Sequence, residues 1–374
     1  MKKIAMLFLV LLLAGSFAFA RGGGQAGSTG GASGGATKVD VFWQSFSDAY
    51  LATIRTAMED QARSLSGLNI THYDCRENQS TQIDMIRTAI TQGTNVLVVN
   101  IVTTGSEDAA MNIVNMARDA RLPIIFFNRE VSDAVINSYN DAAFVGTDAD
   151  EAGYMEGQAI ANLLLKPENW NGTRSKFDLN GDNRINYIML RGEHGNAEAF
   201  GRTLYSVREA NRLLAGKLTL TPSPANETSN QYDNDGISNY FLYGNWSDTE
   251  AFRLMRTALT AHSLTSGAIE LVIANNDMQA IGAIEAMREQ GFNTGEAGAP
   301  FIPVFGVDAL PVATEAIRAG RMHGTVLQDG PRMGRTILAL AQNIANGQAL
   351  MANTSSYNVD SHVAKIRVPY SIVE

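Results

Sequence analysis

The sequence predicts an α/β protein built from two doubly wound, parallel-sheet (Rossmann-like) lobes. Short apolar runs alternate with segments of helical periodicity along most of the chain, which is typical of parallel sheets covered by helices. The alternation occurs twice, and 374 residues are enough for two domains of ordinary size.

The first series of elements begins near residue 38. Its strands are expected where short apolar runs occur, and its helices where apolar residues recur every three or four positions. The expected strands are residues 39–43, 70–73, 96–99 and 123–127, and the expected helices begin near residues 48, 83 and 107.

The second series begins near residue 150 and has similar length. The expected helices are 150–165, 198–214, 249–261, 278–289 and 312–319, and the expected strands are 185–190, 271–274 and 303–306. The final segments, 324–327, a helix from 331 and 366–370, are too short for a third domain and are expected to complete the two lobes. Residues 221–245 lack periodicity and are rich in Pro, Asn, Asp and Ser, which predicts a long surface loop.

The N-terminus reads as a signal peptide over residues 1–20. Two lysines precede an apolar stretch that ends at an Ala18-Phe19-Ala20 cleavage site. Residues 21–37 form a Gly/Ser-rich linker. Ser16 stands where a lipid-modified bacterial protein would have cysteine, so we expect an exported, periplasmic protein that is soluble rather than lipid-anchored.

Charge and missing motifs narrow the function. A net charge of −9 argues against nucleic acid as a partner, because phosphate binding needs a basic face. No glycine-rich turn follows the first strand, and no phosphate loop, metal-binding histidine pair or GxSxG motif is present. A sugar hydrolase stays open as an alternative, because Asp and Glu are plentiful.

Polar side chains follow three of the predicted strands. Asn128 ends one strand, Asn275 to Asp277 end another, and Asp308 ends a third. Ligands of open α/β sheets lie beyond the carboxyl ends of the strands, and amides and carboxylates there suit a hydroxyl-rich ligand. Each could also serve as a helix N-cap, because Asp48, Asn276 and Asp308 precede helices.

Residues 178–186 have the oxygen-ligand spacing of a calcium loop. Asp178, Asn180, Asp182 and Asn186 occupy positions 1, 3, 5 and 9, and the Arg184 carbonyl occupies position 7. Position 12 is a methionine, so the bidentate carboxylate must come from elsewhere in the chain. We expect a structural Ca²⁺, because the loop runs directly into a strand.

Seven segments together resemble the periplasmic glucose/galactose-binding proteins, which are solute-binding components of sugar ABC transporters. They are FFNRE (126–130), VGTD (145–148), DLNGDNRIN (178–186), VIANND (272–277), PVFGVDALP (303–311), GTVLQD (324–329) and IRVPY (366–370). The resemblance implies two lobes joined by a three-segment hinge near Thr147, Leu327 and Arg367. The lobes would comprise residues 38–147 plus 328–366 and residues 148–327 plus 367–374.

The resemblance also implies a site in which two aromatic rings enclose a monosaccharide. The matching rings are Tyr50 and Trp246, the matching polar residues are Asp48, Asn128, Arg202, Asn276 and Asp308, and the missing calcium ligand corresponds to Glu270. Three positions depart from the family: Asn196, Glu198 and Gln328. Glu and Gln reach one methylene further than the family's Asp and Asn, which leaves the epimer, and hexose against pentose, open.

The implied function is capture of a glucose- or galactose-type sugar without chemical change. A monomer would close around the sugar and deliver it to a membrane ABC permease, and some relatives also present it to a chemoreceptor. The alternatives are a binder of another small sugar, such as a pentose, and a hydrolase on the same fold.

Overall fold

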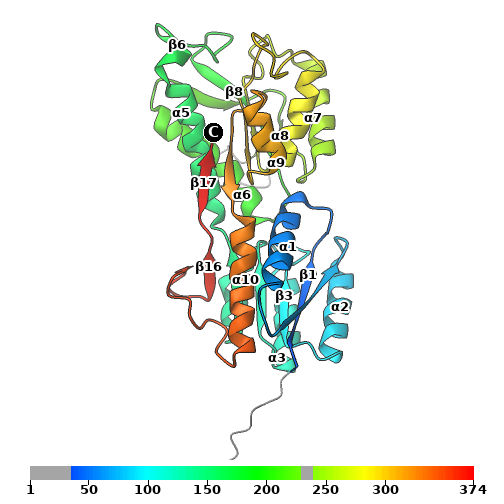
Figure 1. The fold of residues 1–374 in the computed structure, drawn as a ribbon. Coiled ribbons are helices and arrows are strands. Elements are labelled where there is room, and N and C mark those ends of the chain that lie inside the picture. Colours follow the sequence, from blue (N-terminus) through cyan, green and yellow to red (C-terminus); the bar gives the residue numbers. More distant parts are fainter. Residues whose placement is uncertain (1–34, 229–238) are drawn as a thin grey trace, which may run out of the picture. The chain divides into compact units, whose positions relative to one another are not determined.

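Two sheets organise the computed structural model, which describes residues 35–228 and 239–374 (Figure 1). The expected signal peptide and most of the expected linker lie outside these residues. The two-lobed α/β fold class is confirmed, because each sheet is mainly parallel and carries helices on both faces. No helix within the described ranges is long and apolar enough to cross a membrane.

The first lobe contains a sheet of seven described strands in the order β15-β16-β5-β4-β3-β1-β2, all parallel except for the β15–β16 pair. Its elements are β1 (Thr37–Trp43), α1 (Ala49–Ala62), β2 (Leu68–Asp74), α2 (Gln79–Thr91), β3 (Val96–Val99), α3 (Glu107–Ala120), β4 (Ile124–Phe127), α4 (Asp133–Asn137), β5 (Ala142–Gly146), α10 (Gly330–Ala345), β15 (Asn358–Val359) and β16 (Lys365–Arg367).

The second lobe contains the sheet β10-β11-β8-β12-β13-β14-β17, with β9 paired to β8. Its elements are α5 (Ala149–Leu165), η1 (Pro167–Asn169), β6 (Trp170–Asn171), β7 (Arg174–Ser175), β8 (Arg184–Arg191), α6 (Ala197–Leu214), β9 (Thr219–Pro222), β10 (Glu227–Thr228), β11 (Tyr240–Tyr243), α7 (Asp248–Ala261), β12 (Leu271–Ala274), α8 (Asp277–Arg288), β13 (Val304–Val307), α9 (Pro311–Arg318), β14 (Gly324–Gln328) and β17 (Tyr370–Val373).

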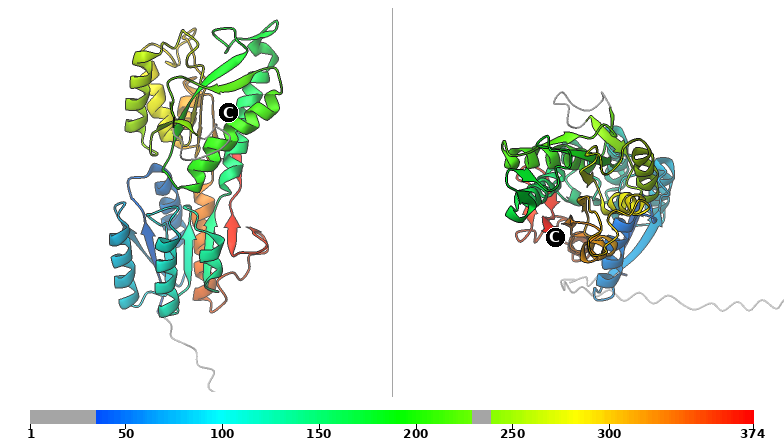
Figure 2. Two further views of the ribbon diagram at one scale, coloured as in Figure 1. Left: turned by 180° about the vertical axis from the view of Figure 1, so that it is seen from behind. Right: turned by 90° about the horizontal axis from the view of Figure 1, so that it is seen from above.

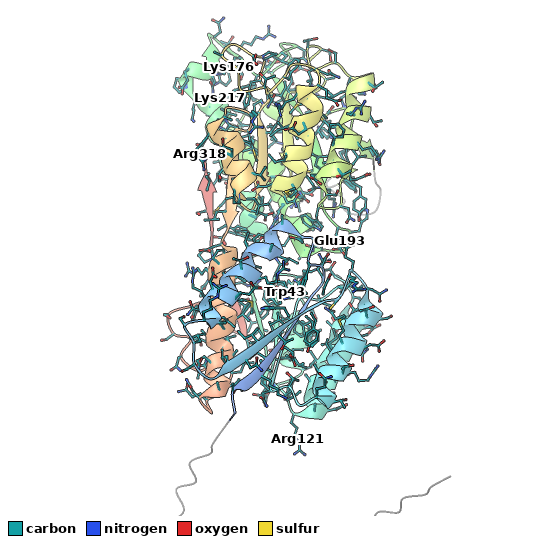
Figure 3. The ribbon with its side chains drawn as sticks, turned by 45° about the vertical axis from the view of Figure 1, so that its right-hand side comes forward. Trp43, Arg121, Lys176, Glu193, Lys217 and Arg318 are labelled. Atoms are coloured by element: carbon teal, nitrogen blue, oxygen red, sulfur yellow. The ribbon has the colours of Figure 1, made fainter. Side chains whose placement is uncertain are left out.

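Each sheet separates two apolar cores, because successive side chains of a strand point to opposite faces. In β1, Val41 and Trp43 pack in the core with α1 and α10, whereas Phe42 lies in the core on the other face. The second sheet divides its apolar residues in the same way. Trp43 is fully buried, in keeping with its place inside the first lobe (Figure 3).

The chain passes between the two sheets three times. The crossings follow β5, β14 and β16, and the last one separates β16 from β17 by two residues, the second of which is Pro369. Figure 2 shows this last segment, coloured red, running from one lobe into the other beside the orange α10. These crossings place the carboxyl ends of both parallel sheets toward the same region.

One prediction about a single element is wrong, and an interior strand of the first sheet was not predicted. Residues 221–245 are not one surface loop, because β11 pairs in parallel with β8 inside the sheet, with Phe241 and Leu242 buried. Residues 229–238 of that segment lie outside the described ranges. The structure also contains β5, for which no strand was predicted, between β4 and β16.

Candidate ligand-binding site

A cavity of about 50 Å³ lies between the carboxyl ends of the two sheets. All ten residues predicted to bind sugar line it, together with Gln44, Leu51 and Arg129. The ten are Asp48, Tyr50, Asn128, Asn196, Glu198, Arg202, Trp246, Asn276, Asp308 and Gln328. The structure therefore brings together residues from both lobes that are up to 280 positions apart in the chain (328 − 48 = 280).

Several lining residues sit at helix N-termini. Asp48 begins α1 and accepts a hydrogen bond from Leu51 N at 2.9 Å. Asn196 begins α6 in the same way, and Asn276 begins α8. Capping and lining the cavity are thus compatible roles, and the positive ends of three helix dipoles point toward the cavity.

Asp308 does not cap a helix, although its position before α9 allowed that interpretation. The N-cap of α9 is Leu310, which makes no side-chain cap bond. Asp308 instead has a φ of 120° and carries its carboxylate into the cavity. Its Oδ1 lies 3.7 Å from Arg202 Nη1, and burial raises the pKa of its carboxyl well above the usual value.

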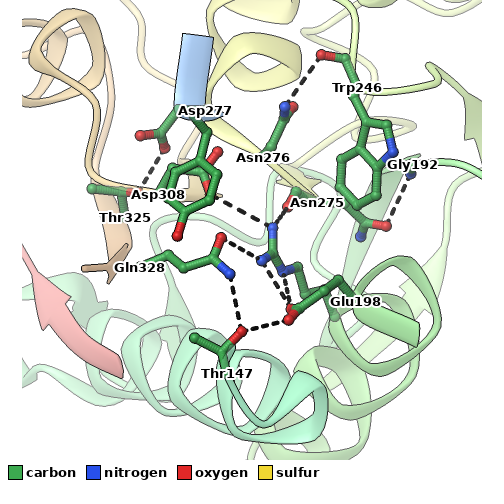
Figure 4. Close-up of polar contacts among 12 residues, drawn as sticks. Thr147, Gly192, Glu198, Trp246, Asn275, Asn276, Asp277, Asp308, Thr325 and Gln328 are labelled. Atoms are coloured by element: carbon green, nitrogen blue, oxygen red, sulfur yellow. Dashed lines mark hydrogen bonds and ion pairs between the residues drawn. The ribbon is translucent and has the colours of Figure 1, made fainter. Parts of the chain in front are cut away.

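A buried network ties the three crossings together beneath the cavity (Figure 4). Thr147 Oγ1 donates to Glu198 Oε1 at 2.5 Å, and Gln328 Nε2 donates to Thr147 Oγ1 at 2.9 Å. Tyr370 OH donates to Glu198 Oε2 at 2.7 Å. Arg202 donates to Glu198 Oε2 from Nη2 at 2.9 Å and to Gln328 Oε1 at 3.1 Å. Thr147, Gln328 and Tyr370 belong to the first, second and third crossing respectively.

This network occupies the polar atoms of two predicted sugar-binding side chains. Both oxygens of Glu198 and both polar atoms of Gln328 have protein partners. The extra methylene of each side chain thus lets it reach the crossings. That Glu198 and Gln328 bind the sugar directly stays a prediction. In the structure, both side chains accept hydrogen bonds from Arg202 and so hold its guanidinium in position.

Two buried donors at the cavity have no hydrogen-bond partner among residues 35–228 and 239–374. These are the Tyr50 hydroxyl and Arg129 Nε. Burying a polar group without a partner costs free energy, so both atoms favour an acceptor in the cavity. Burial raises the pKa of Tyr50 well above its usual value, which keeps the phenol a donor.

Arg129 was not predicted, although it follows Asn128 in the FFNRE segment. Its Nη2 donates to Glu193 Oε2 across the cleft, from the end of β4 to the turn after β8. Figure 3 shows Glu193 at the side of the second lobe that faces the first. Burial lowers the pKa of Arg129, while Glu193 and Asp48 act in the opposite direction. The pair therefore joins the lobes beside the cavity.

The indole of Trp246 lies flat against the backbone of Gly192. A Cβ at Gly192 would overlap the ring, so only glycine leaves room for it. Arg202 stands over the same ring, with its Cζ 5.8 Å from the centroid. Asn245 and Trp246 both have positive φ, 47° and 66°, a backbone conformation that persists where the surroundings enforce it.

The residues predicted to bind calcium also lie together. Asp178 accepts from the backbone N–H groups of Gly181 and Asn183, at 2.6 and 3.0 Å. Glu270 Oε2 accepts from Asn186 N at 2.8 Å, which brings this distant carboxylate to the loop. Asp178 and Glu270 are both buried. Burial raises the pKa of Glu270, and the nearby charge of Asp178 adds to that shift.

The chemical types of the oxygen donors in this loop fit a hard cation. The donor set joins the carboxylates of Asp178, Asp182 and Glu270 with two amides and one backbone carbonyl, and oxygen donors are those that Ca²⁺ prefers. Within residues 35–228 and 239–374, however, no three or more His, Cys, Asp or Glu side chains converge on one point that could hold a metal ion. Calcium binding therefore stays a prediction.

Comparison with known proteins gives consistent matches. The family profile described as the periplasmic binding protein domain matches residues 39–349. The D-galactose/methyl-galactoside binding periplasmic protein MglB of Haemophilus influenzae is 29% identical over 373 residues, covering 99% of this chain and 96% of that protein. The D-xylose-binding periplasmic protein of Escherichia coli is 24% identical, covering 80% and 74%.

Solved structures share the fold. A solute-binding protein of Bacillus halodurans with bound myo-inositol has a TM-score of 0.64 and 24% identity, over 91% of this chain and 94% of that one. A solute-binding protein of Clostridium phytofermentans with bound β-D-glucose has a TM-score of 0.66 and 15% identity, over 90% and 94%.

Proposed function

The chain belongs to the periplasmic binding protein domain family, and from this premise we propose that it captures a monosaccharide of the glucose or galactose type and delivers it to an ABC permease. The observation that supports this most directly is the convergence of all ten predicted residues on one cavity between the lobes. The match to the galactose-binding relative over nearly its whole length supports the sugar class.

Capture follows from the division of the cavity between the lobes. Tyr50 lies in the first turn of α1, Asn128 follows β4 and Asp308 follows β13, and a ligand that contacts all of them bridges both lobes. Cleft closure around a bridging ligand buries it and fixes the lobes, and a permease can then distinguish the closed form. A micromolar affinity corresponds to about 8 kcal/mol.

The chemistry of the cavity suits a neutral polyol. The carboxyl oxygens of Asp48 and Asp308 accept from hydroxyls, while Arg129 and Tyr50 donate to them. The Trp246 ring supplies an apolar face for the C–H side of a pyranose. The sugar leaves unchanged in this proposal, since the site's role is to bind and release.

The experiment is calorimetric titration of the exported protein with glucose, galactose, xylose, ribose and myo-inositol. We expect stoichiometric binding of glucose or galactose, with the sugar recovered unchanged by chromatography after hours of incubation. Preference for a pentose would favour the alternative binder, and conversion of an offered glycoside would favour a hydrolase. Absence of binding to every sugar would contradict the proposed function.

We further propose a structural Ca²⁺ held by Asp178, Asn180, Asp182, the Arg184 carbonyl, Asn186 and Glu270. An ion there would neutralise two buried carboxylates and fix the loop that leads into β8. The protein is proposed to act as an exported monomer, and a chemoreceptor is a second proposed partner. Light scattering measures the molar mass of the protein in solution and thereby tests whether it is a monomer.

A further inference from the structure

Three consecutive residues after β4 reach three different parts of the molecule. Asn128 lines the cavity, and Arg129 donates to Glu193 of the second lobe. Glu130 contacts β16, the strand that leads into the third crossing. Asn128 has a φ of 60°, so the chain leaves the extended conformation of β4 at this residue. Residues 128–130 therefore connect the cavity, the second lobe and the hinge within one short segment.

The carboxylate of Glu130 pairs with two cations of β16. Its Oε1 accepts from Lys365 Nζ at 2.6 Å and from Arg367 Nη2 at 2.8 Å. The side chains of Lys365 and Glu130 are only 3% and 21% exposed, so water and salt screen the pair less than a surface pair. Although burial acts to raise the pKa of Glu130, the hydrogen bonds from Arg367 and Lys365 hold it below its usual value. Glu130 is therefore charged at neutral pH.

Arg367 extends this contact to the first crossing. Its Nη1 donates to the carbonyl oxygen of Thr147 at 2.7 Å. Thr147 follows β5 and Arg367 ends β16, so one guanidinium joins two crossings at the point where each leaves the first lobe. Because Glu130 holds that guanidinium, the ends of these two crossings are tied to the segment that carries Asn128 and Arg129.

Each cation also has a second carboxylate that lies outside residues 128–130. Asp360 Oδ2 lies 2.9 Å from Arg367 Nη2, and Asp133 Oδ1 lies 2.7 Å from Lys365 Nζ. These two carboxylates are sufficient to neutralise both cations. Charge balance therefore does not require Glu130, and what distinguishes it is its place next to the arginine that reaches the second lobe.

We propose that Glu130 is a positioning residue that couples closure of the lobes to the hinge. It anchors residues 128–130 to the crossings and thereby keeps Arg129 within reach of Glu193. Without this anchor the lobes can still close around a sugar, but the closed form is held less firmly and the sugar leaves sooner. This inference rests on the proposed function, because capture by closure is the process that the anchor serves.

Glu130→Gln tests the anchor, because it removes the charge and keeps the size of the side chain. With glucose and galactose as probes, we expect the dissociation rate to rise at least fivefold and the association rate to change less than twofold. The reason is that the sugar enters before the lobes close, whereas it leaves only after they open. Stopped-flow tryptophan fluorescence measures both rates, since Trp246 lines the cavity.

Asp360→Asn is the matched control. It removes the other carboxylate of Arg367, and the side chain of Asp360 is 23% exposed, close to the 21% of Glu130. Asp133→Asn is the corresponding control for Lys365. Both controls leave residues 128–130 unchanged, and we expect each to alter the dissociation rate less than twofold. A purely structural role of Glu130 would lower the melting temperature and leave the two rates as they are in the controls.

A double-mutant cycle with Glu193→Gln tests whether Glu130 acts through Arg129. The printed partners of Glu130 are Lys365 and Arg367, whereas that of Glu193 is Arg129. Substitutions at sites that share no partner usually have additive effects. If Glu130 positions Arg129, Glu130→Gln in the Glu193→Gln background should raise the dissociation rate less than twofold.

The outcomes separate the coupling from the function on which it rests. If neither sugar binds the wild type, the proposed function fails and the coupling falls with it. If a sugar binds, but Glu130→Gln releases it no faster than Asp360→Asn does, the coupling alone is overturned. Full multiplication of the two rate effects in the double variant with Glu193→Gln overturns it as well, while sugar capture stands.

Discussion

Thr147 Oγ1 donates a 2.5 Å hydrogen bond to the carboxylate of Glu198, and this bond joins the first interlobe crossing to helix α6. Both residues are buried. Glu198 also pairs with Arg202 and accepts from Tyr370 of the third crossing. One carboxylate therefore holds both Arg202, which is predicted to bind the ligand, and two of the segments about which the lobes would rotate.

Replacing Glu198 with alanine is expected to destabilise the protein by about 3 kcal/mol, because it removes the nearer acidic partner of the buried Arg202, whose pairing with Asp308 spans 3.7 Å. Urea denaturation measures the loss. The matched control is Glu315→Ala, which breaks a pair with Arg318 whose side chains are 61% and 70% exposed. The control is expected to cost less than about 1 kcal/mol. Equal losses in the two variants would contradict the network.

Gly192→Ala is expected to weaken sugar binding at least tenfold while leaving the fold intact. The new Cβ would overlap the Trp246 ring, which must then leave the cavity wall. The backbone φ of Gly192 is not positive, so alanine brings no backbone strain. Calorimetry measures the affinity, and Gly35→Ala, whose Cβ meets no atom within 4 Å, is the control. Unchanged affinity would show that Trp246 contributes nothing to binding.

The pair of Arg129 and Glu193 is expected to favour the closed, sugar-bound form. Glu193→Gln removes the charge across the cleft and should weaken sugar binding about three- to tenfold, more at low salt than at high salt. A double-mutant cycle with Arg129→Gln isolates the pairwise contribution. If the two substitutions are additive, the pair does not couple closure to binding.

Asp277 gives the second lobe a pH-dependent stability. Burial raises the pKa of its carboxyl to about 7, although Thr325 Oγ1 and Leu310 N donate to it. The unfolded chain releases this proton near pH 3.9, so the folded state binds more protons between pH 4 and pH 7. The free energy of unfolding contributed by this group therefore falls as pH rises through that window.

The measurement compares wild type with Asp277→Asn in urea at pH 4.5, 5.5, 6.5 and 7.5. The variant cannot titrate at this position, so the wild type should lose stability relative to it as pH rises. A stability difference that stays constant across these pH values would show that Asp277 titrates normally.

The sequence was sufficient for the sheets' main strands and for ten of the thirteen residues that line the cavity between the lobes. Continuous apolar runs such as 96–99 predict buried parallel strands on their own. The interior strand β5 was missed, because three of the five residues of its segment AAFVG are Ala or Gly, which have low β-propensity. β11 was missed because four apolar and aromatic residues stand in a polar stretch.

The hydrogen-bond partners of individual side chains could not be predicted from the sequence. Glu198 was expected to face the sugar, but its bonds to Thr147 and Tyr370 depend on how three distant crossings meet. Arg129 follows Asn128 directly, and no sequence pattern tells which of two neighbouring polar residues points into a cavity. Its unpaired Nε becomes visible only in three dimensions.

Calcium is expected to raise the melting temperature of the protein, because an ion that binds only the folded state stabilises it by mass action. At a free concentration 100 times the Kd, the gain is about 2.7 kcal/mol. Thermal denaturation in EDTA and in CaCl₂ measures it. Glu270→Gln should abolish most of the shift, because this side chain supplies the carboxylate that the loop itself lacks.

The control is Glu296→Gln, an exposed acidic residue outside the loop, which should keep the full response to calcium. Glu270→Gln should also melt higher than wild type in EDTA, since neutralising one of two buried carboxylates relieves the repulsion from Asp178. Opposite effects in EDTA and in calcium distinguish an ion-binding carboxylate from one that only caps the loop backbone. Identical melting temperatures of the wild type in EDTA and in CaCl₂ would rule out a structural Ca²⁺ at residues 178–186.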